Sequence, residues 1–166
     1  MNKSGTLVFF CGKMGAGKST KAVDMAREIN AILMSEDDWL GKLYPEEINN
    51  FNDYIKYSSR LKPLIKTLVQ NILKSGISVV MDFPGNTRKQ RTWFKEIISE
   101  LNIPHRLIYL DADDQLCLKR IARRRKAQPE REKFDTEEVF RHVTSYFQPP
   151  CTTEGFEVEI VNCEST

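Results

Sequence analysis

The sequence predicts an α/β fold in which a mostly parallel sheet is covered by helices on both faces. Apolar runs of strand length recur along the chain, and segments with helical periodicity lie between them. This alternation is typical of parallel sheets, because each crossover between parallel strands needs a long connection, usually a helix. The expected strands are residues 6–11, 31–34, 77–83, 106–110 and 157–161. The third and fourth runs are apolar enough to lie centrally in such a sheet.

The intervening helices are indicated by the spacing of their apolar residues. Residues 18–30 and 61–75 read as amphipathic helices, and 87–101, 113–126 and 136–147 follow with weaker patterns. In the second of these helices the apolar face consists of Leu61, Leu64, Ile65, Leu68, Val69 and Ile72. Gly76 follows where a helix would end before the next strand.

A phosphate-binding loop comes directly after the first strand. The segment fits the pattern G-x-x-x-x-G-K-[ST] in full and consists of Gly12, Lys13, Met14, Gly15, Ala16, Gly17, Lys18, Ser19 and the less specific Thr20. Its glycines let consecutive backbone N–H groups approach a phosphate, and the helix that follows directs its positive end at the same anion. We therefore expect a nucleoside triphosphate as ligand.

Two side chains of this loop carry specific roles. The Lys18 ammonium is suited to bridge the β- and γ-phosphates, where charge builds up during phosphoryl transfer. The Ser19 hydroxyl suits a Mg²⁺ ion that also takes phosphate oxygens. ATP and Mg²⁺ are the expected cofactors.

Size and composition set wider bounds. The chain has 166 residues, enough for one domain over residues 1–166, and its net charge of +2 gives no global case for binding nucleic acid or membrane. Four cysteines show no C-x-x-C spacing, and no apolar run approaches the length of a membrane span. We therefore expect a cytoplasmic protein with free thiols. Its oligomeric state stays open.

Acidic residues follow the second strand, at the edge of the sheet where ligands of parallel sheets bind. Phosphoryl transfer to an alcohol needs a carboxylate that orients the hydroxyl and accepts its proton, and Asp37 or Asp38 is suited to this role. The structural alternative is that one of them caps a helix beginning near Trp39. Capping explains only one carboxylate of the pair.

Acidic residues also follow the third and fourth strands. Asp82 ends a hydrophobic strand, the pattern of an acid that holds Mg²⁺ or its waters. Asp111 and Asp113 come after the fourth strand, and Asp113 lies where a helix N-cap is expected. Of these three residues, only Asp82 is assigned to the metal.

The densest run of charge in the chain is residues 119–126. Arg120 and Arg124 are spaced i, i+4, which places both guanidinium groups on one helix face. A lid that closes over ATP would use such a pair, because guanidinium matches phosphate geometry and stacks on rings. The alternatives are a solvated helix face or a nucleic-acid patch.

Together these motifs resemble the small P-loop kinases over about the full length of the chain. The sequence is similar to the AAA_33-type ATP-binding proteins and to the kinase domain of polynucleotide kinase, and more distantly to chloramphenicol phosphotransferase and zeta toxin. The resemblance implies a P-loop kinase fold with five parallel strands, Asp37 as the catalytic base, and a mobile lid carrying Arg120 and Arg124. It also implies that a tail loop at residues 148–152 helps to form the adenine pocket.

The acceptor side departs from polynucleotide kinases, which have an Arg shortly after the acidic pair. Here the residues after the pair offer only Lys42, so a polynucleotide acceptor is not favoured. Asp38, Arg88 and Arg91 are candidate contacts to an acceptor, the two arginines to an anionic one. Aromatic residues suggest an aromatic-lined acceptor region or, equally, helix packing: Trp39, Tyr44, Phe51, Tyr54 and Tyr57.

The functional hypothesis is an ATP-dependent kinase that transfers the γ-phosphate to a hydroxyl of a small-molecule or nucleotide-like acceptor. A 5′-hydroxyl polynucleotide kinase is the alternative within the same class. A nucleotide-dependent switch or ATPase without an acceptor is the alternative from another class. A GTPase is disfavoured, because the chain has no Asn-Lys-x-Asp segment to read guanine.

Overall fold

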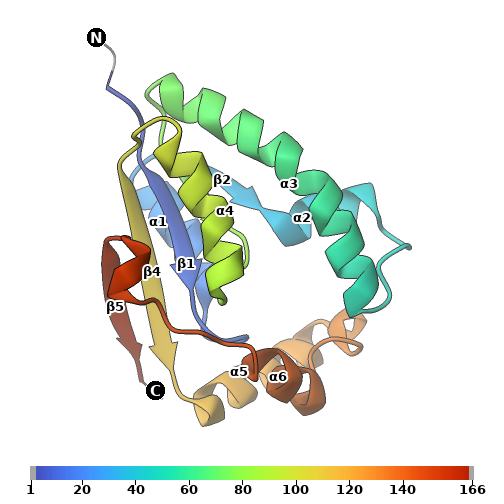
Figure 1. The fold of residues 1–166 in the computed structure, drawn as a ribbon. Helices are drawn as coiled ribbons and strands as arrows, with labels where there is room; N and C mark the ends of the chain where they lie inside the picture. Colours follow the sequence, from blue (N-terminus) through green and yellow to red (C-terminus); the bar gives the residue numbers. More distant parts are fainter. Residues whose placement is uncertain (1–2, 165–166) are drawn as a thin grey trace.

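The computed structural model describes residues 3–164, and its centre is a sheet of five parallel strands (Figure 1). The strands are β1 (Leu7–Cys11), β2 (Ile32–Ser35), β3 (Val79–Asp82), β4 (His105–Ala112) and β5 (Val158–Cys163). They lie in the order β2-β3-β1-β4-β5. The expected parallel sheet is confirmed, and β3 and β4 flank β1 as inner strands. None of the helices within residues 3–164 combines the length and apolar character needed to cross a bilayer.

Helices cover both faces of the sheet, and two hydrophobic cores result. The helices are α1 (Lys18–Glu28), α2 (Glu36–Leu43), α3 (Phe51–Lys74), α4 (Arg88–Ser99), α5 (Asp114–Ala127) and α6 (Glu137–Thr144), with two 3₁₀ turns, η1 (Pro129–Arg131) and η2 (Thr152–Glu154). Alternate residues of β1 serve the two cores: Phe9 packs with α3 and α4, and Phe10 with α1 and α5. All five residues of β1 are fully buried, which places the strand at the centre of the molecule.

Helix α3 is longer than the sequence predicts, since it begins at Phe51 rather than at residue 61. The Asn50 side chain caps its start by accepting the Asp53 N–H at 2.9 Å. Pro63 lies inside the helix, where a proline removes one backbone hydrogen bond. The buried stripe of Leu61, Ile65, Val69 and Leu73 outweighs that loss. Leu64, expected on this face, is instead 70% exposed.

Helix α2 begins earlier than expected. Its first residue is Glu36, and the Ser35 side chain caps it by accepting the Asp38 N–H at 3.4 Å. The structural alternative, in which Asp37 or Asp38 caps a helix starting near Trp39, is therefore wrong. Both aspartates lie inside the first turn, so neither carboxylate is needed as a cap.

The carboxyl ends of the strands meet α5 and α6, as the arrowheads of β1 and β4 show in Figure 1. Asp113 caps α5 by accepting the Leu116 N–H at 2.8 Å, so the capping role expected from the sequence is confirmed. This end of the sheet therefore carries the phosphate-binding loop, the acidic strand ends and the arginine-rich helix together.

Candidate active site

The phosphate-binding loop connects β1 to α1 and needs glycine at two positions. Gly15 and Gly17 have φ angles of +80° and +101°, in the left-handed region that favours glycine. A Cβ atom at Gly15 would also lie only 2.7 Å from the Cys117 carbonyl oxygen of α5. Gly17 is the N-cap of α1 and brings no side chain to the helix start. The first N–H groups of α1 are thus open to an anion.

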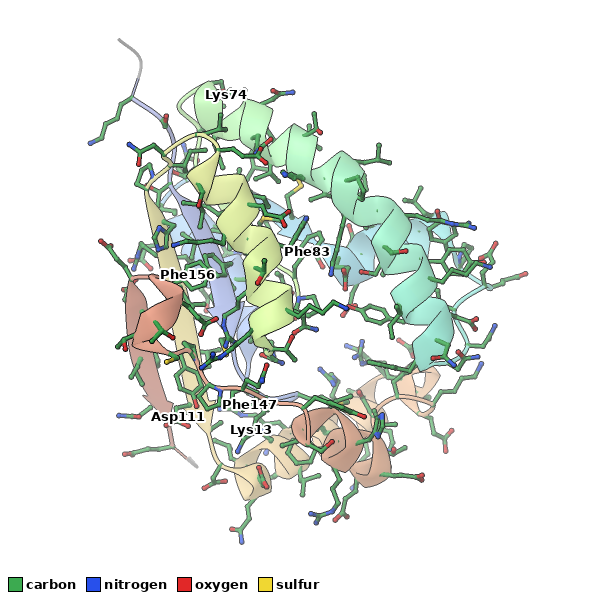
Figure 2. All side chains as sticks on the ribbon, in the orientation of Figure 1. Lys13, Lys74, Phe83, Asp111, Phe147 and Phe156 are labelled. Atoms are coloured by element: carbon green, nitrogen blue, oxygen red, sulfur yellow. The ribbon has the colours of Figure 1, made fainter. Side chains whose placement is uncertain are left out.

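Neighbouring elements hold the loop in place. The Asn86 side chain, after β3, accepts the Gly12 N–H at 2.9 Å. Lys13, labelled in Figure 2 near α5, pairs with Asp114 at the start of that helix, with 2.8 Å between Nζ and Oδ1. The loop is therefore fixed from both sides, by the β3–α4 connection and by α5.

Lys18 is the first residue of α1, and its ammonium group is directed back over the loop. It donates hydrogen bonds to the Gly12 carbonyl oxygen and, at 3.3 Å, to that of Lys13. Burial lowers the pKa of Lys18, although the Asp82 carboxylate acts in the opposite direction. The ammonium thus lies where the loop converges.

Asp82, the last residue of β3, is the point at which the candidate catalytic groups meet. Burial raises the pKa of Asp82, a hydrogen bond from Ser19 and the charge of Lys18 oppose that rise, and the charge of Asp37 adds to it. Ser35 of β2 is the register partner of Asp82, so Asp37, two residues after Ser35, follows the strand beside Asp82. Three separate segments of the sequence, with Lys18 and Ser19 in one of them, therefore act on this carboxylate. Thr20, the next residue of α1, is exposed.

Oxygen ligands for a magnesium ion are present in this cluster. The Ser19 hydroxyl and the Asp82 carboxylate are hard oxygen donors, and Mg²⁺ in phosphate sites is typically held by one or two protein oxygens, substrate phosphates and water. Within residues 3–164 there is no group of three or more His, Cys, Asp or Glu side chains arranged to hold a metal. The residues present thus fit an ion that is bound together with its nucleotide.

The three acidic residues of α2 lie in three different environments. Glu36 is 1% exposed and accepts hydrogen bonds from the hydroxyls of Tyr54 and Ser58. Asp38 is exposed and forms a 3.0 Å ion pair with Lys42. Asp37 is also exposed, and its charge raises the pKa of Asp82. Of the expected pair, Asp37 is therefore the one whose charge acts on the end of β3, since Ser35, two residues before it, is the register partner of Asp82.

The two expected lid arginines lie on one face of α5 and have different partners. Arg120 donates from Nη1 to the Ala16 carbonyl oxygen of the phosphate loop at 2.8 Å. Arg124 forms two hydrogen bonds to Asp135, from Nε at 2.7 Å and from Nη2 at 2.6 Å. Arg131 also donates to Asp135, at 2.9 Å. Arg120 therefore contacts the phosphate loop, whereas the Arg124 guanidinium is held by Asp135.

The prediction that Arg91 contacts an acceptor is wrong. Its side chain is fully buried and donates two hydrogen bonds to Glu154, at 2.8 and 3.1 Å. The third nitrogen donates to the Gly85 carbonyl oxygen at 2.9 Å, so the guanidinium is saturated within the protein. Arg88 is exposed at the start of α4, and its backbone N–H is held by the Gln148 side chain at 2.9 Å.

Most of the aromatic residues considered for an acceptor region pack against the core. Trp39, Tyr44, Tyr54 and Tyr57 are partly buried beside the α3–α4 core, and the rings of Tyr44 and Tyr57 lie 4.2 Å apart. Phe51 is 50% exposed. Helix packing accounts for the first four residues, as the alternative reading of the sequence allowed.

Three residues of the site were missed by the sequence analysis: Glu36, Asp135 and Glu154. Each is an acid whose partners come from another part of the chain or from an irregular segment. Glu36 directly precedes the aspartate pair, and Asp135 follows an arginine four residues earlier. Glu154 has no local signal at all, because its partner lies 63 residues away.

A model of a known protein family matches this chain. The AAA_33 family model, described as an AAA domain, matches residues 7–150, which is most of the chain. The chain belongs to the AAA_33 family. The expected resemblance to this family is confirmed, and the match extends from β1 to the tail loop.

Two curated relatives of this AAA_33 protein are adenylate kinases. It is 26% identical over 144 residues to an adenylate kinase of Prochlorococcus marinus (strain AS9601), covering 81% of this chain and 74% of that one. A second adenylate kinase, from Rickettsia africae (strain ESF-5), is 27% identical over 122 residues, which are 69% of this chain but only 56% of that one.

Two solved structures show the same fold. A protein from Chloroflexus aurantiacus J-10-fl, described as a kinase, superposes with a TM-score of 0.73 at 18% identity over 96% of this chain and 86% of that one. The APS kinase of Mycobacterium tuberculosis, solved with AMPPNP and APS, gives a TM-score of 0.64 at 18% identity over 98% and 91%. The AAA_33 chain thus has the fold of the P-loop kinases, as its sequence indicated.

Proposed function

We propose that this protein transfers the γ-phosphoryl group of MgATP to a hydroxyl of a small-molecule or nucleotide-like acceptor. The observation that carries the proposal is the placing of Lys18 over the phosphate loop and of Asp37 just after Ser35, the register partner of Asp82, at the carboxyl ends of the strands. A phosphate-binding group, an oxygen pair suited to a metal and a carboxylate suited to be a base are all that phosphoryl transfer to an alcohol requires.

In the proposed reaction the acceptor hydroxyl oxygen attacks the γ-phosphorus while the bond from that phosphorus to the β–γ bridging oxygen breaks. The electron pair of the broken bond leaves with ADP, and Asp37 takes the hydroxyl proton. Lys18 and the open N–H groups of α1 hold the phosphates, and Arg120 and Arg124 stabilise the transferring group. Mg²⁺, held by Ser19 and Asp82, would neutralise phosphate charge.

The adenine would lie against the tail loop at residues 148–152, the place that the family resemblance gives it. Support comes from the anchoring of this loop, because the Asn86 carbonyl oxygen accepts the Gln148 N–H at 2.8 Å. Asn86 also holds Gly12 of the phosphate loop, so one residue fixes both walls of the proposed nucleotide site. The cytoplasm stays the proposed compartment, and the free thiols of all four cysteines fit its reducing conditions.

Acceptor-dependent ADP release is the test. Wild type, Asp37→Asn and Asp38→Asn are assayed for release of ADP from MgATP with nucleosides, with a 5′-hydroxyl oligonucleotide and with water alone. The proposal expects release that rises sharply with one acceptor, and that falls far more in Asp37→Asn than in Asp38→Asn while ATP affinity changes little. Stimulation by the oligonucleotide alone would identify a polynucleotide kinase. Release independent of every acceptor and unaffected by Asp37→Asn would identify an ATPase switch.

A further inference from the structure

Glu36 is a buried acid that the proposed reaction does not use. One carboxylate oxygen accepts the hydroxyl of Tyr54, and the other accepts the hydroxyl of Ser58 at 2.9 Å. Both donors come from the first three turns of α3, spaced i, i+4 on one helix face. Burial raises the pKa of Glu36, and the two hydroxyls act against that rise. Glu36 therefore joins the start of α2 to α3. The hydrogen bonds from the two hydroxyls offset the free-energy cost of removing its carboxylate from water.

The direction of Asp37 depends on this contact. Successive residues of a helix are separated by about 100° around the axis, so fixing one side chain of the first turn sets the directions of the next. Glu36 and Leu40, spaced i, i+4, are the buried residues of α2 and face the core. Asp38 lies on the solvent side with Lys42. Asp37 lies between these two directions, and it follows Ser35, the register partner of Asp82, by two residues.

Apart from this contact, the rotation of α2 is held by the apolar packing of Leu40 and Trp39 on the core, which is less directional than a hydrogen bond. The helix has eight residues, about two turns, and an isolated helix of this length is unstable in water. The hydrogen bond of its cap, Ser35, is long at 3.4 Å. An apolar residue in place of Glu36 would be cheaper to bury but would not be directional. The hydroxyls of Tyr54 and Ser58 are directional.

We propose that Glu36, Tyr54 and Ser58 form a positioning unit that holds the Asp37 carboxylate toward the phosphate loop. Asp37 is the catalytic residue of the proposed function, on which this inference rests, and the unit acts through it without touching substrate. The unit has a specific consequence: removing a hydroxyl on α3 lowers phosphoryl transfer although neither hydroxyl belongs to the phosphate site.

The kinetic test removes one hydroxyl at a time. Tyr54→Phe and Ser58→Ala are compared with Ser59→Ala, whose hydroxyl is exposed and bonds only to the Lys56 carbonyl oxygen of its own helix. With the best acceptor of the panel above, kcat is expected to fall about tenfold in Tyr54→Phe and severalfold in Ser58→Ala, with KM for ATP nearly unchanged. The thermal midpoint is expected to fall by a few degrees in both variants, because the buried Glu36 carboxylate loses one donor. Ser59→Ala should match wild type. Equal activity of all three variants would overturn the proposal.

A double-mutant cycle separates positioning from general weakening of the fold. In an Asp37→Asn background Tyr54→Phe should have no further effect on kcat, because the residue it positions is already disabled. Independent losses that multiply would overturn the positioning role. Glu36→Gln keeps an acceptor for Tyr54 and a donor to Ser58, so it should retain most of the transfer activity. If Asp37→Asn itself is fully active, the proposed function has failed, which is a different result.

A readout without turnover covers the case in which no panel acceptor is used. The chain has two tryptophans, and Trp39 lies two residues after Asp37 on α2. Protein labelled with 5-fluorotryptophan should give two ¹⁹F resonances, assigned with Trp39→Phe. Tyr54→Phe should shift or broaden the Trp39 resonance, and Ser59→Ala should leave it in place. An unchanged Trp39 resonance in Tyr54→Phe would contradict the inference, whatever the reaction is.

Discussion

Arg91 of α4 and Glu154 of η2 form a two-bond ion pair in the interior, with 2.8 Å from Nε to Oε1 and 3.1 Å from Nη2 to Oε2. Arg91 also donates to the Gly85 carbonyl oxygen and to the sulfur of Cys11, the last residue before the phosphate loop. Glu154 in turn accepts the Cys151 N–H at the end of the tail loop. The pair thus connects the phosphate loop, the β3–α4 connection and the tail loop.

Truncation of Arg91 should destabilise the fold strongly. Arg91→Met leaves the Glu154 carboxylate and the Gly85 carbonyl without their main partner, and breaking a buried pair in this way typically costs about 3–5 kcal/mol. Arg106 and Glu159 offer a matched control, because they have the same two-bond geometry at 2.7 and 2.9 Å but are substantially exposed. Arg106→Met should cost about 0–1 kcal/mol.

Urea unfolding followed by circular dichroism measures both variants under the same conditions. Similar losses in the free energy of unfolding in Arg91→Met and Arg106→Met would show that burial of the Arg91–Glu154 pair does not make its loss more costly. If Arg91→Met lowers the free energy of unfolding only slightly, water reaches the Glu154 carboxylate once the guanidinium is removed.

The same pair predicts a pH dependence of stability. Burial alone would raise the pKa of Glu154, but hydrogen bonds from Arg91 and from the Cys151 N–H outweigh it and hold that pKa below its usual value of 4.5. A lowered pKa in the folded state means that the contribution is present above about pH 4.5 and is lost as the pH falls through the folded-state value. Acidification should therefore remove the stabilisation that Glu154 provides.

Glu154→Gln isolates this contribution from the other carboxyl groups. The difference in the free energy of unfolding between wild type and Glu154→Gln should be largest near pH 7 and shrink as the pH falls toward about 3. Urea titrations at several pH values measure the difference. A difference that stays constant over this range would contradict the lowered pKa of Glu154.

Lys18→Ala should abolish turnover and weaken binding of MgATP, because the ammonium at the centre of the loop has no substitute there. We expect a loss of at least about a hundredfold in kcat. Lys21→Ala, one turn further along α1, is the control for a general change of charge. Steady-state ADP release and nucleotide titration measure the two effects. Unchanged catalysis in Lys18→Ala would refute the assignment of the phosphate loop.

The sequence predicts the centre of the sheet well, because β1 and most of β3 are continuous apolar runs. Burial on both faces leaves β1 with no polar position, which is a strong local signal. The start of α3 is not predicted, because residues 51–60 mix aromatic and polar side chains and Pro63 argues against a helix. Helix α3 is stabilised by the packing of Leu61 and the other buried residues of its face on the core. This packing depends on residues far away in the sequence, so a local stretch of sequence does not reveal it.

The candidate site divides in the same way. The phosphate loop is contiguous, so spacing alone predicts Lys18 and Ser19, and the position of Asp82 follows from the rule for strand ends. Arg91 looked like a surface residue because its partner is distant in sequence and only the fold brings them together. Glu36 was overlooked beside two more conspicuous aspartates. Its role depends on hydroxyls of α3, and the sequence of α2 does not contain them.

Arg124→Ala should lower turnover more than it lowers nucleotide affinity, because a lid arginine acts chiefly on charge that develops in the transition state. Arg124 pairs with Asp135, which is fully buried. Burial alone would raise the pKa of Asp135, and hydrogen bonds from Arg124 and Arg131 hold it below its usual value. Asp135 thus stays charged and keeps the Arg124 guanidinium in a defined place.

We therefore expect Asp135→Asn to reproduce part of the Arg124→Ala defect, and kcat to fall about tenfold in Arg124→Ala with a smaller change in KM for ATP. The exposed neighbour Arg123 provides the control, since Arg123→Ala removes the same charge from α5 without touching the pair. Steady-state kinetics at varied ATP separates kcat from KM. Equal losses in Arg123→Ala and Arg124→Ala would mean that α5 contributes only a diffuse positive charge, whereas a loss confined to Arg124→Ala and Asp135→Asn assigns the effect to the guanidinium that Asp135 holds.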